Sequence, residues 1–465
     1  MKHFLLKILK SILKQLARLM VWRFKPKIIG ITGSAGKTST KEAIFAVLKN
    51  HHRVRKSKGN LNNEIGIPLT ILGDWSEKEL KLVSRDTPPG EKRIKKLFFW
   101  IKVIVSALIR VLFLHKSAYP RVLILEYAAD RPGDIKYLLE IARPQIGVVT
   151  TVGEIPVHVE FFSGPEAVAR EKSKLIESLP ANGFAVLNFD NEIVMEMRER
   201  TRARVITFGF AEGADLRITN FDLTQTNADL YADLYADLNE EARSARGSAS
   251  DQHNIDQRES VWREVPVGVS FKLEYAGSVV PVVLKNAFGK AQAYAAAASA
   301  CVGLIFDLNL VEISEALSNN YQPAKGRMNL IAGIKDTYII DDTYNASPIS
   351  MQEALETLRN LPAKRKIAVL GDMLELGKYS IEAHESLGRF VAPIVDILVT
   401  VGPRAKFIAE EAKNSGLAEN KILSFDTAGE AGLAVQDLIK PGDLILVKAS
   451  RAIGLEKVVE EIKKI

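Results

Sequence analysis

The residues whose types and spacing point most directly to chemistry lie in the stretch Lys27–Thr40, KIIGITGSAGKTST. A glycine-rich turn between an apolar strand and a helix directs backbone N–H groups and a helix N-terminus at one point, which suits a polyphosphate. In such a loop Lys37 lies against the β- and γ-phosphates and the Thr38 hydroxyl ligates Mg²⁺. Ile31 stands where the plain Walker spacing has a glycine. A structural turn would explain the glycines but not the lysine–threonine pair, so the sequence predicts a nucleotide-phosphate site. The predicted nucleotide contacts are Gly33, Ser34, Ala35, Gly36, Lys37, Thr38 and Ser39.

Further along the chain, three side chains are suited to a metal or to phosphates. Glu126 ends the apolar run Val122–Leu125, and a carboxylate at the C-terminal end of a parallel strand can hold Mg²⁺ or its water. The run IGVVTTV leads to His158, a candidate ligand for a second metal, although a lone histidine is more often structural. In the helical stretch AVAREKSKLIESL, Lys172 and Lys174 are both candidates for a cation near the phosphates. Ordinary solvation is the alternative for these two lysines.

Three asparagines, Asn60, Asn62 and Asn63, lie in KSKGNLNNEIGIPLTIL, residues 56–72. Asparagine and glycine at these positions predict an irregular loop. Carboxamides beside a nucleotide site can fix a polar substrate, and the alternative is an ordinary capped turn.

Length and composition limit the class of protein to which these residues belong. The chain has 465 residues, which is enough for two or three domains with ample core. A single cysteine, Cys301, excludes an intramolecular disulfide framework and fits a reducing compartment. The net charge of +7 is modest for this length, and no basic-aromatic array suggests nucleic acid.

The first 27 residues predict a basic amphipathic helix. No acidic residue precedes Glu42, and the lysines and arginine recur at three- and four-residue steps opposite leucines and isoleucines. Such a helix either lies in the headgroup region of an anionic membrane or packs on the next domain or a second subunit. Charges interrupt the apolar run, which disfavours a cleaved signal peptide.

A second basic apolar segment spans residues 91–118. Leu97 to Leu114 would form a helix about 27 Å long at about 1.5 Å per residue, close to a bilayer core. Lys102 and Arg110 would each cost about 2.5–3.5 kcal/mol at a membrane centre, which disfavours spanning. Because Lys102, Ser106 and Arg110 share a face, we expect an in-plane helix with its polar stripe toward headgroups. Core burial with both charges snorkelling to the surface is the alternative.

Several strings occur in the order in which they occur in the Mur ligase family. They are GITGSAGKTST, GNLNNEIGIPLT, the Glu126 strand, KGR, DDTYNASPISM, GDMLELG and PGDLILVKASR. They look most like the branch of the family that adds D-alanyl-D-alanine to UDP-N-acetylmuramoyl-tripeptide. The resemblance covers roughly Lys27 to Ile465. The strings NLNNEIGIP and DDTYNASP are the specific ones, because the related folylpolyglutamate synthetases would not be expected to carry them.

The resemblance implies an α/β fold with two shared domains. A P-loop central Mur ligase domain would span residues 28–321, and a Rossmann-like doubly wound C-terminal domain would span residues 322–465, after the helix of residues 1–27. The alternation of strands and helices beyond Pro323 agrees with a doubly wound domain. Residues 91–118 would be a basic apolar insertion and residues 208–264, with the repeat NADLYADLYADLNEE, a polar surface insertion without chemistry.

The implied activity is ATP-dependent amide ligation in peptidoglycan precursor synthesis, by a cytoplasmic monomer. In the family, a substrate carboxylate takes the γ-phosphoryl group of ATP to give an acyl phosphate and ADP. The amine of D-alanyl-D-alanine then attacks, and phosphate leaves. Such chemistry needs cations around the transferring phosphoryl group and a water-poor site, so ATP and two Mg²⁺ ions are the expected cofactors.

The resemblance also assigns roles to individual residues. Lys172 matches the lysine that the family carbamylates, which turns a cation into an anion able to hold a second Mg²⁺, and leaves Lys174 as its solvated neighbour. Arg327 resembles an arginine that reaches the nucleotide phosphates, Asp342 would hold ribose, and Asn345 would approach the nucleotide. For DDTYN, an Asx-rich turn is the alternative. The implied catalytic residues are Lys37, Lys172 and His158; the metal ligands are Thr38, Glu126, His158 and Lys172; the substrate-binding residues are Asn60, Asn62, Asn63, Asp372, Glu375, Lys448 and Arg451.

The chain departs from the family pattern at several places. Thr151 stands where an asparagine is usual, Ala291 and Gln292 stand where a His-Asn pair contributes to the adenine pocket, and Ala449 replaces a glycine. Members ordinarily carry a domain before the phosphate loop that grips the uridine diphosphate of the substrate, whereas 29 residues precede Gly30 here. We therefore expect either substrate binding by the central domain alone or an acceptor attached to a membrane lipid.

Three functions thus stay open. The first is the D-alanyl-D-alanine ligation of a nucleotide-sugar peptide. The second is a related amide ligation of a lipid-linked or other acceptor, with residues 1–27 and 91–118 on an anionic membrane. The third is a non-enzymatic, membrane-docked nucleotide-binding protein. The presence of the Glu126 carboxylate together with Lys172 and the nucleotide motifs disfavours this function.

Overall fold

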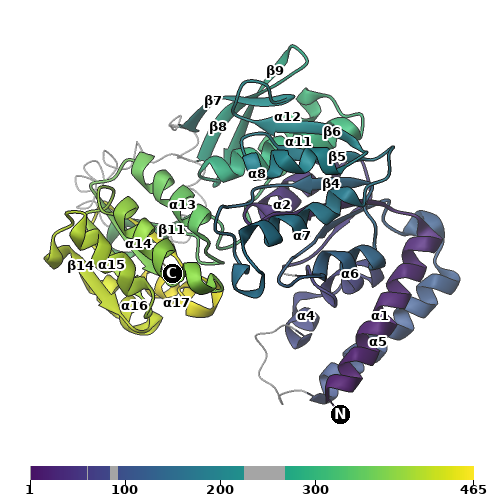
Figure 1. Cartoon of the computed structure of the whole chain (residues 1–465), viewed down its shortest axis with the longest axis horizontal. Coiled ribbons are helices and arrows are strands. Elements are labelled where there is room, and N and C mark those ends of the chain that lie inside the picture. The colour runs from purple at the N-terminus through teal and green to yellow at the C-terminus, as the bar shows by residue number, and fades with distance from the viewer. Residues whose placement is uncertain (1, 60, 84–92, 225–267, 465) are drawn as a thin grey trace, which may run out of the picture. The chain divides into compact units, whose positions relative to one another are not determined.

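The structure is a computed structural model that describes residues 2–59, 61–83, 93–224 and 268–464. The chain divides into two compact units. The first unit comprises residues 1–217 and 294–316, and the second comprises residues 218–293 and 317–465. Asn60 and most of the predicted polar insertion, residues 225–264, lie outside the described residues. Figure 1 labels the elements.

A parallel sheet organises the first unit. Its strand order is β2-β3-β1-β4-β5-β6-β7, and the neighbouring strands pair in parallel. The central strand β1 is flanked by β3 and β4, and all three are almost entirely buried, as expected of a parallel sheet covered on both faces. The strands are β1 (Lys27–Thr32), β2 (Val54–Lys56), β3 (Val122–Glu126), β4 (Ile146–Val149), β5 (Phe184–Asn188), β6 (Arg204–Gly209) and β7 (Leu216–Thr224).

The helices predicted for residues 1–27, after the phosphate loop, over Leu97–Leu114 and in AVAREKSKLIESL are confirmed as α1, α2, α5 and α7, whereas one predicted loop is partly helical. The predicted irregular loop of residues 56–72 is wrong in its second half, because Gly66 begins α3, whose residues are all buried. Apolar burial of Ile67, Leu69 and Ile71 outweighs the glycine and the asparagines before it. The helices are α1 (Lys2–Phe24), α2 (Lys37–Leu48), α3 (Gly66–Leu72), α4 (Glu77–Val83), α5 (Arg93–Phe113), α6 (Asp134–Ile141), α7 (Pro165–Glu177) and α8 (Glu192–Met195), with α11 (Lys290–Ile305) and α12 (Leu310–Asn320) each shared with the second unit.

Both basic apolar segments are helical and lie side by side in Figure 1 as α1 and α5, which contact each other. α1 is packed on the following segment, because Leu13, Ala17 and Met20 are fully buried within a core that also contains Leu123 and Tyr127. One face of α5 enters the same core. No described helix is long and apolar enough to cross a membrane.

The expected orientation of the polar stripe on α5 is wrong. Lys102 Nζ lies 2.5 Å from Glu79 Oε1 of α4, and Arg110 donates to the carbonyl of Leu72 and lies over the ring of Trp75. These partners draw the stripe toward α3 and α4. Lys102 nevertheless stays exposed beside Glu79, and the remaining exposed side of α5 is apolar except for Lys95.

The second unit contains a second sheet, with strand order β10-β11-β15-β12-β13-β14. All pairs are parallel except the antiparallel pair of β10 and β11. The strands are β10 (Asn329–Gly333), β11 (Thr337–Asp341), β12 (Arg365–Gly371), β13 (Ile397–Val401), β14 (Ile422–Phe425) and β15 (Asp443–Lys448). The antiparallel strands β8 (Gly268–Tyr275) and β9 (Ser278–Lys285) follow β7 in the order of the first sheet, which has nine strands. The helices are α13 (Pro348–Asn360), α14 (Ser380–Val391), α15 (Ala405–Asn414), α16 (Ala428–Leu438) and α17 (Glu456–Ile462). The predicted α/β class is confirmed, with two mainly parallel sheets.

Candidate active site

The phosphate loop has the backbone conformation that its glycines permit. Gly33 has φ +149°, and a Cβ added there would lie 2.0 Å from Thr150 Oγ1. Gly36 has φ +82° and is the N-cap of α2. Both conformations disfavour any residue with a side chain. The loop therefore delivers the N-terminus of α2, whose first-turn amides have no acceptor within the helix, to the end of β1.

Lys37 folds over this loop. Its Nζ donates to the carbonyl of Gly33 at 2.6 Å and lies 3.4 Å from the carbonyl of Ser34. The ammonium group thus lies at the loop, as predicted for a residue that contacts phosphates. The loop itself is fixed to the segment that follows β4, because Ser34 N donates to the carbonyl of Thr151 at 2.6 Å.

Strand register places Glu126 beside the loop. Glu126 at the end of β3 is the parallel partner of Ile31 on β1. The carboxylate is buried, and Lys41 Nζ lies 2.8 Å from Glu126 Oε1. Lys41 follows Lys37 by one helical turn on α2, so the two ammonium groups rise from the same face of that helix. Lys41 was missed in the sequence, and the signal that could have found it is this i, i+4 spacing.

The structure distinguishes the two lysines of α7. Lys172 is buried, and its pKa is lowered to about 7, first by burial and then by the nearby positive charge of Lys37. Lys174 is partly exposed, and its Nζ pairs with Glu171 Oε2 at 2.6 Å. Lys37 and Lys172 are therefore close enough to interact electrostatically, whereas Lys174 pairs with the buried carboxylate of Glu171.

His158 is held near the same group of charges by Asp130. Its Nε2 lies 3.3 Å from Asp130 Oδ1, and its backbone has φ +70° as it begins the turn Val159–Phe161. The negative charge of Asp130 also favours the charged form of Lys172. Asp130 was missed in the sequence because it lies in an irregular stretch after β3, where no spacing links it to His158 or Lys172.

Some of the side chains described above are suitable ligands for Mg²⁺. The Thr38 hydroxyl and the Glu126 carboxylate are oxygen ligands of the type that Mg²⁺ prefers, and Glu126 already has a cation, the ammonium group of Lys41, at 2.8 Å. Within the described ranges, no group of three or more His, Cys, Asp or Glu side chains could hold a metal ion. The assignment of His158 and Lys172 to a second ion stays a prediction.

Of the predicted asparagines, Asn62 and Asn63 are described. Asn63 Oδ1 accepts hydrogen bonds from the backbone N–H groups of Ile65 and Gly66 at the start of α3, at 3.1 and 2.9 Å. The carbonyl of Asn62 accepts from Ala128 N at 3.2 Å. Asn63 thus caps a helix, in agreement with the capped-turn alternative, and the loop is tied to the segment that follows Glu126.

In the second unit, strand ends bring Asp342 and Lys448 together. Asp341 on β11 is the parallel partner of Val447 on β15, so the next residues of both strands leave the same edge of the sheet. Lys448 Nζ lies 2.6 Å from Asp342 Oδ2 and 2.9 Å from the carbonyl of Asn345. Burial raises the pKa of Asp342, and the charge of Lys448 opposes that shift. The buried side chains of Asp342 and Lys448, which were assigned separately from the sequence, therefore pair, and the backbone carbonyl of the partly buried Asn345 joins them.

Two arginines meet at Tyr344. The Arg327 guanidinium lies 4.2 Å from the centre of the Tyr344 ring, and that of Arg451 lies 5.4 Å from it. Gln292 Nε2 donates to the carbonyl of Arg327 at 3.4 Å. Tyr344 was missed in the sequence, although the string DDTYN contains it.

Asp372 follows β12 at the same edge of the sheet, and its carboxylate accepts hydrogen bonds from backbone N–H groups. Its Oδ1 accepts from Arg404 N at 3.0 Å and from Ala405 N at 2.7 Å, at the start of α15. A Cβ on Gly402 would lie 2.6 Å from this carboxylate. Glu375 follows in the left-handed region, with φ +64°. The geometry gives Asp372 a helix-capping role, and its predicted substrate contact stays a prediction.

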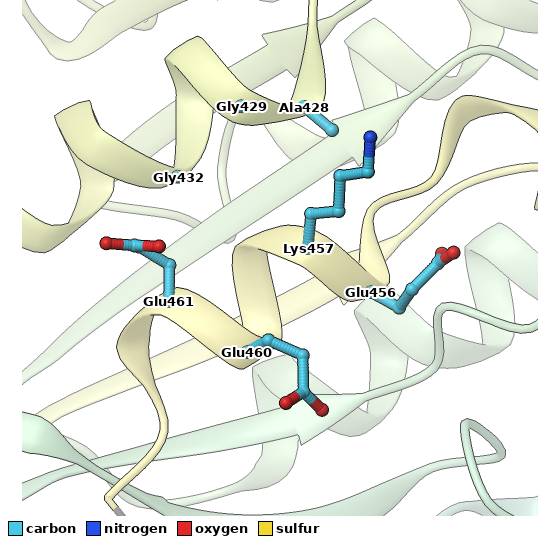
Figure 2. A pocket seen from close by; sticks show the side chains of 7 residues that line it. All are labelled: Ala428, Gly429, Gly432, Glu456, Lys457, Glu460 and Glu461. Atoms are coloured by element: carbon cyan, nitrogen blue, oxygen red, sulfur yellow. The ribbon is translucent and has the colours of Figure 1, made fainter.

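A hollow of about 380 Å³ lies elsewhere in the second unit, between α16 and α17 (Figure 2). None of its lining residues is a predicted site residue, and four of the seven carry a charged side chain. The residues are Ala428, Gly429, Gly432, Glu456, Lys457, Glu460 and Glu461. It has no part in the chemistry described above.

Comparison with known proteins matches both units. The family model described as "Mur ligase middle domain" matches residues 31–83 and 108–244, and the one described as "Mur ligase, glutamate ligase domain" matches residues 326–451. The UDP-N-acetylmuramoyl-tripeptide--D-alanyl-D-alanine ligase of Synechocystis sp. is 30% identical over 442 residues, which cover 95% of this chain and 75% of that protein. The ligase of the same name from Mycobacterium tuberculosis (strain H37Rv) is 31% identical and covers 94% of this chain and 72% of its own length.

Solved structures agree with this relationship. The MurF ligase of Thermotoga maritima in complex with ADP has a TM-score of 0.70 at 27% identity, and the match covers 97% of this chain and 83% of that one. MurF from Acinetobacter baumannii has a TM-score of 0.71 at 24% identity, with 97% and 79% of the two chains covered, and shares the fold. With two curated relatives at 30% identity or more that match along most of both chains, the chain belongs to the Mur ligase family of ATP-dependent ligases.

Proposed function

We propose that this chain is an ADP-forming ligase that joins D-alanyl-D-alanine to UDP-N-acetylmuramoyl-tripeptide in peptidoglycan precursor synthesis, inside the cell. The observation that carries the proposal is the identity of 30% over 95% of the chain with a ligase of that name. The phosphate loop with Lys37 folded over it supports the use of ATP. No observation favours a non-enzymatic role.

In this proposal the first unit handles the phosphates. The amides at the N-terminus of α2 and the Lys37 ammonium hold the β- and γ-phosphates, because both place positive charge at the loop. Thr38 and Glu126 hold Mg²⁺, which supplies charge neutralisation when it is bound. His158, whose imidazole lies beside Asp130, would be a ligand of the second Mg²⁺ ion.

Carbamylation of Lys172 is a further part of the proposal. An uncharged amine adds to CO₂ to give a carbamate and a proton, so the reaction needs the neutral form of the lysine. Burial favours that form, since it lowers the pKa of Lys172 to about 7. ¹³C NMR of protein equilibrated with ¹³C-bicarbonate tests this step: we expect a carbamate signal in the parent and none in Lys172→Arg, and its absence from the parent would contradict the assignment.

The second unit contributes the remaining nucleotide and substrate contacts in this proposal. Arg327, Asp342 and Asn345 bind ATP, and Lys448, Arg451, Asp372 and Glu375 bind the acceptor and the dipeptide. Asn60, Asn62 and Asn63, which belong to the first unit, also bind the acceptor in this proposal. Support comes from the buried Lys448–Asp342 pair and from the two guanidinium groups at Tyr344.

Phosphate release from ATP tests the proposed function. We expect release that requires both UDP-N-acetylmuramoyl-tripeptide and D-alanyl-D-alanine, with the ligated product seen by mass spectrometry. L-alanyl-L-alanine is the matched control amine, and ATP with dipeptide alone is the control for uncoupled hydrolysis. Release that is independent of every amine tested would overturn the proposal.

A second candidate function is amide ligation to an acceptor carried by a membrane lipid. The observation that favours it is the row of exposed apolar side chains on α5, including Leu97, Phe98 and Leu112. The same assay with a lipid-linked muramoyl peptide in vesicles separates the two candidates. Faster turnover with the lipid-linked acceptor than with the nucleotide-linked one would favour the second.

A further inference from the structure

Exposed apolar side chains are concentrated on two helices. Among the described residues, 21 large apolar side chains are exposed, and 16 of them belong to α1 and α5. The remaining five are scattered over other elements, as is usual on protein surfaces. We call the outward apolar side chains of α1 and α5 the α1–α5 surface. They are Phe4, Leu5, Leu6, Ile8, Ile12, Leu19 and Trp22 on α1, and Ile94, Leu97, Phe98, Ile101, Val105, Leu108, Ile109, Leu112 and Phe113 on α5.

α1 has two apolar faces rather than one. At about 100° per residue, the buried Leu13, Ala17 and Met20 occupy one side of the helix, and the exposed Ile12 and Leu19 lie about 100° and about 120° away from Leu13. Packing of α1 on the first unit therefore uses only part of its apolar side chains. The predictions of a packed helix and of a surface-binding helix describe different faces of the same element.

α5 presents a continuous apolar row. Ile94, Ile101, Val105, Leu108 and Leu112 recur at three-, four- and seven-residue steps along its outward side, and each is between 44% and 71% exposed. The opposite side packs into the core through other residues. Since α1 and α5 lie side by side (Figure 1), the two rows belong to one surface of the first unit. Exposed patches of this kind mark interaction sites.

The charge around these rows indicates which kind of partner the α1–α5 surface binds. Neither helix contains an acidic residue, and exposed lysines and arginines accompany the apolar side chains. The exposed cations on the two helices or next to them are Lys7, Arg18, Arg23, Lys25, Lys95, Lys102 and Lys116. In a two-fold dimer through this surface, the same cations of both copies would approach one another and repel. An anionic lipid surface supplies both apolar depth and opposite charge.

We propose that the α1–α5 surface docks this protein on an anionic lipid bilayer, with both helices in the plane of the interface. Apolar side chains such as Leu97 and Leu112 enter the boundary between headgroups and acyl chains, and Lys7 and Arg18 contact lipid phosphates. This docking is independent of which acceptor the enzyme uses, since it involves none of the proposed site residues. Its consequence is a higher local concentration of the enzyme at the membrane.

Vesicle flotation of the full chain tests the proposal. At low salt we expect the protein to float with vesicles of phosphatidylcholine and phosphatidylglycerol, and to float several-fold less with phosphatidylcholine alone or at high salt. In the double variant Leu97→Asp/Leu108→Asp we expect binding to fall on the order of tenfold or more, because two apolar contacts become charges of the same sign as the lipid. Leu433→Asp is the matched control, since Leu433 is 59% exposed on α16, and it should float like the parent.

Two further measurements keep the outcomes distinct. Thermal unfolding and phosphate release with soluble substrates should be the same in all three proteins, which separates docking from folding and from catalysis. Light scattering after size exclusion reports the oligomeric state. The proposal is overturned if the parent stays in the aqueous fraction at low salt, if Leu433→Asp loses binding as much as the double variant, or if the parent is a dimer that the double variant converts to a monomer without vesicles present.

Discussion

Lys41 Nζ lies 2.8 Å from Glu126 Oε1, and both side chains are almost completely buried. The carboxylate that the sequence assigned to a metal is thus compensated by a lysine one turn beyond the phosphate-loop lysine. Glu126 ends β3 beside the loop and Lys41 rises from α2, so the ion pair joins the two elements that position the phosphates.

Removing Lys41 should therefore destabilise the protein more than removing both partners. We expect Lys41→Met to lower the free energy of unfolding by about 3–5 kcal/mol, because it leaves a buried carboxylate uncompensated. The double variant Lys41→Met/Glu126→Gln should recover most of that loss. Urea unfolding of the parent, both single variants and the double variant measures the coupling, and strictly additive losses would refute it.

Lys37→Ala should abolish most ATP-dependent turnover. Its ammonium lies at the loop carbonyls of Gly33 and Ser34, where phosphates would take their place. Loss of one preorganised electrostatic contact typically costs about 10²–10³ in kcat, and we expect a loss of that order in phosphate release. Lys49→Ala, an exposed lysine at the C-cap of the same helix, is the control and should be unaffected. A variant at Lys37 that turns over like the parent would remove the loop from the mechanism.

Lys172 should make stability depend on pH in a defined direction. Burial lowers its pKa from 10.5 to about 7, so between these values the unfolded chain binds a proton that the folded chain does not. The free energy of unfolding contributed by this group therefore rises as the pH increases from about 7 toward 10.5.

Comparison with Lys172→Met isolates that contribution. Urea unfolding in CO₂-free buffer at several pH values in this window should show the parent gaining stability relative to the variant as the pH rises. CO₂ is excluded so that carbamate formation does not add to the effect. A difference between the two proteins that does not change with pH would show that Lys172 titrates normally in the folded state.

Asp372 should act on stability through the N-terminus of α15. Its Oδ1 accepts from two backbone N–H groups there, so Asp372→Ala should cost about 1–3 kcal/mol. Asp372→Asn should lose much less, because the amide oxygen still accepts. Chemical unfolding gives these values. If Asp372→Asn is as stable as the parent but has a raised KM for D-alanyl-D-alanine, the predicted substrate contact is supported as well.

Tyr344 should hold Arg327 through its ring rather than through its hydroxyl. The guanidinium lies 4.2 Å from the ring centre, and a contact of this kind contributes about 0.5–1 kcal/mol. We expect Tyr344→Leu to raise the KM for ATP about two- to fivefold and Tyr344→Phe to leave it nearly unchanged. Equal effects of both substitutions would assign the role to the hydroxyl.

The local order of the chain could be predicted from its residues. The apolar run before the phosphate loop, the helix after it and the alternation beyond Pro323 carry their periodicity within a few neighbouring positions. A four- or five-residue strand such as β14 or β10 and an alanine- and glycine-rich helix such as α16 have too little pattern of their own to be predicted. Their existence depends on packing against neighbours.

What the sequence by itself determined was therefore the fold class, the phosphate loop with Lys37 and Thr38, and the identity of most candidate residues. Only the tertiary structure decided which side chains compensate one another, such as Lys41 with Glu126 and Lys448 with Asp342, and which of the two lysines on α7 is buried. It also decided that α1 is buried along one apolar face and exposed along another. The physical reason is that charge compensation and burial are set by strand register and by segments far apart in the chain, whereas spacing along the sequence records only the neighbours within one element.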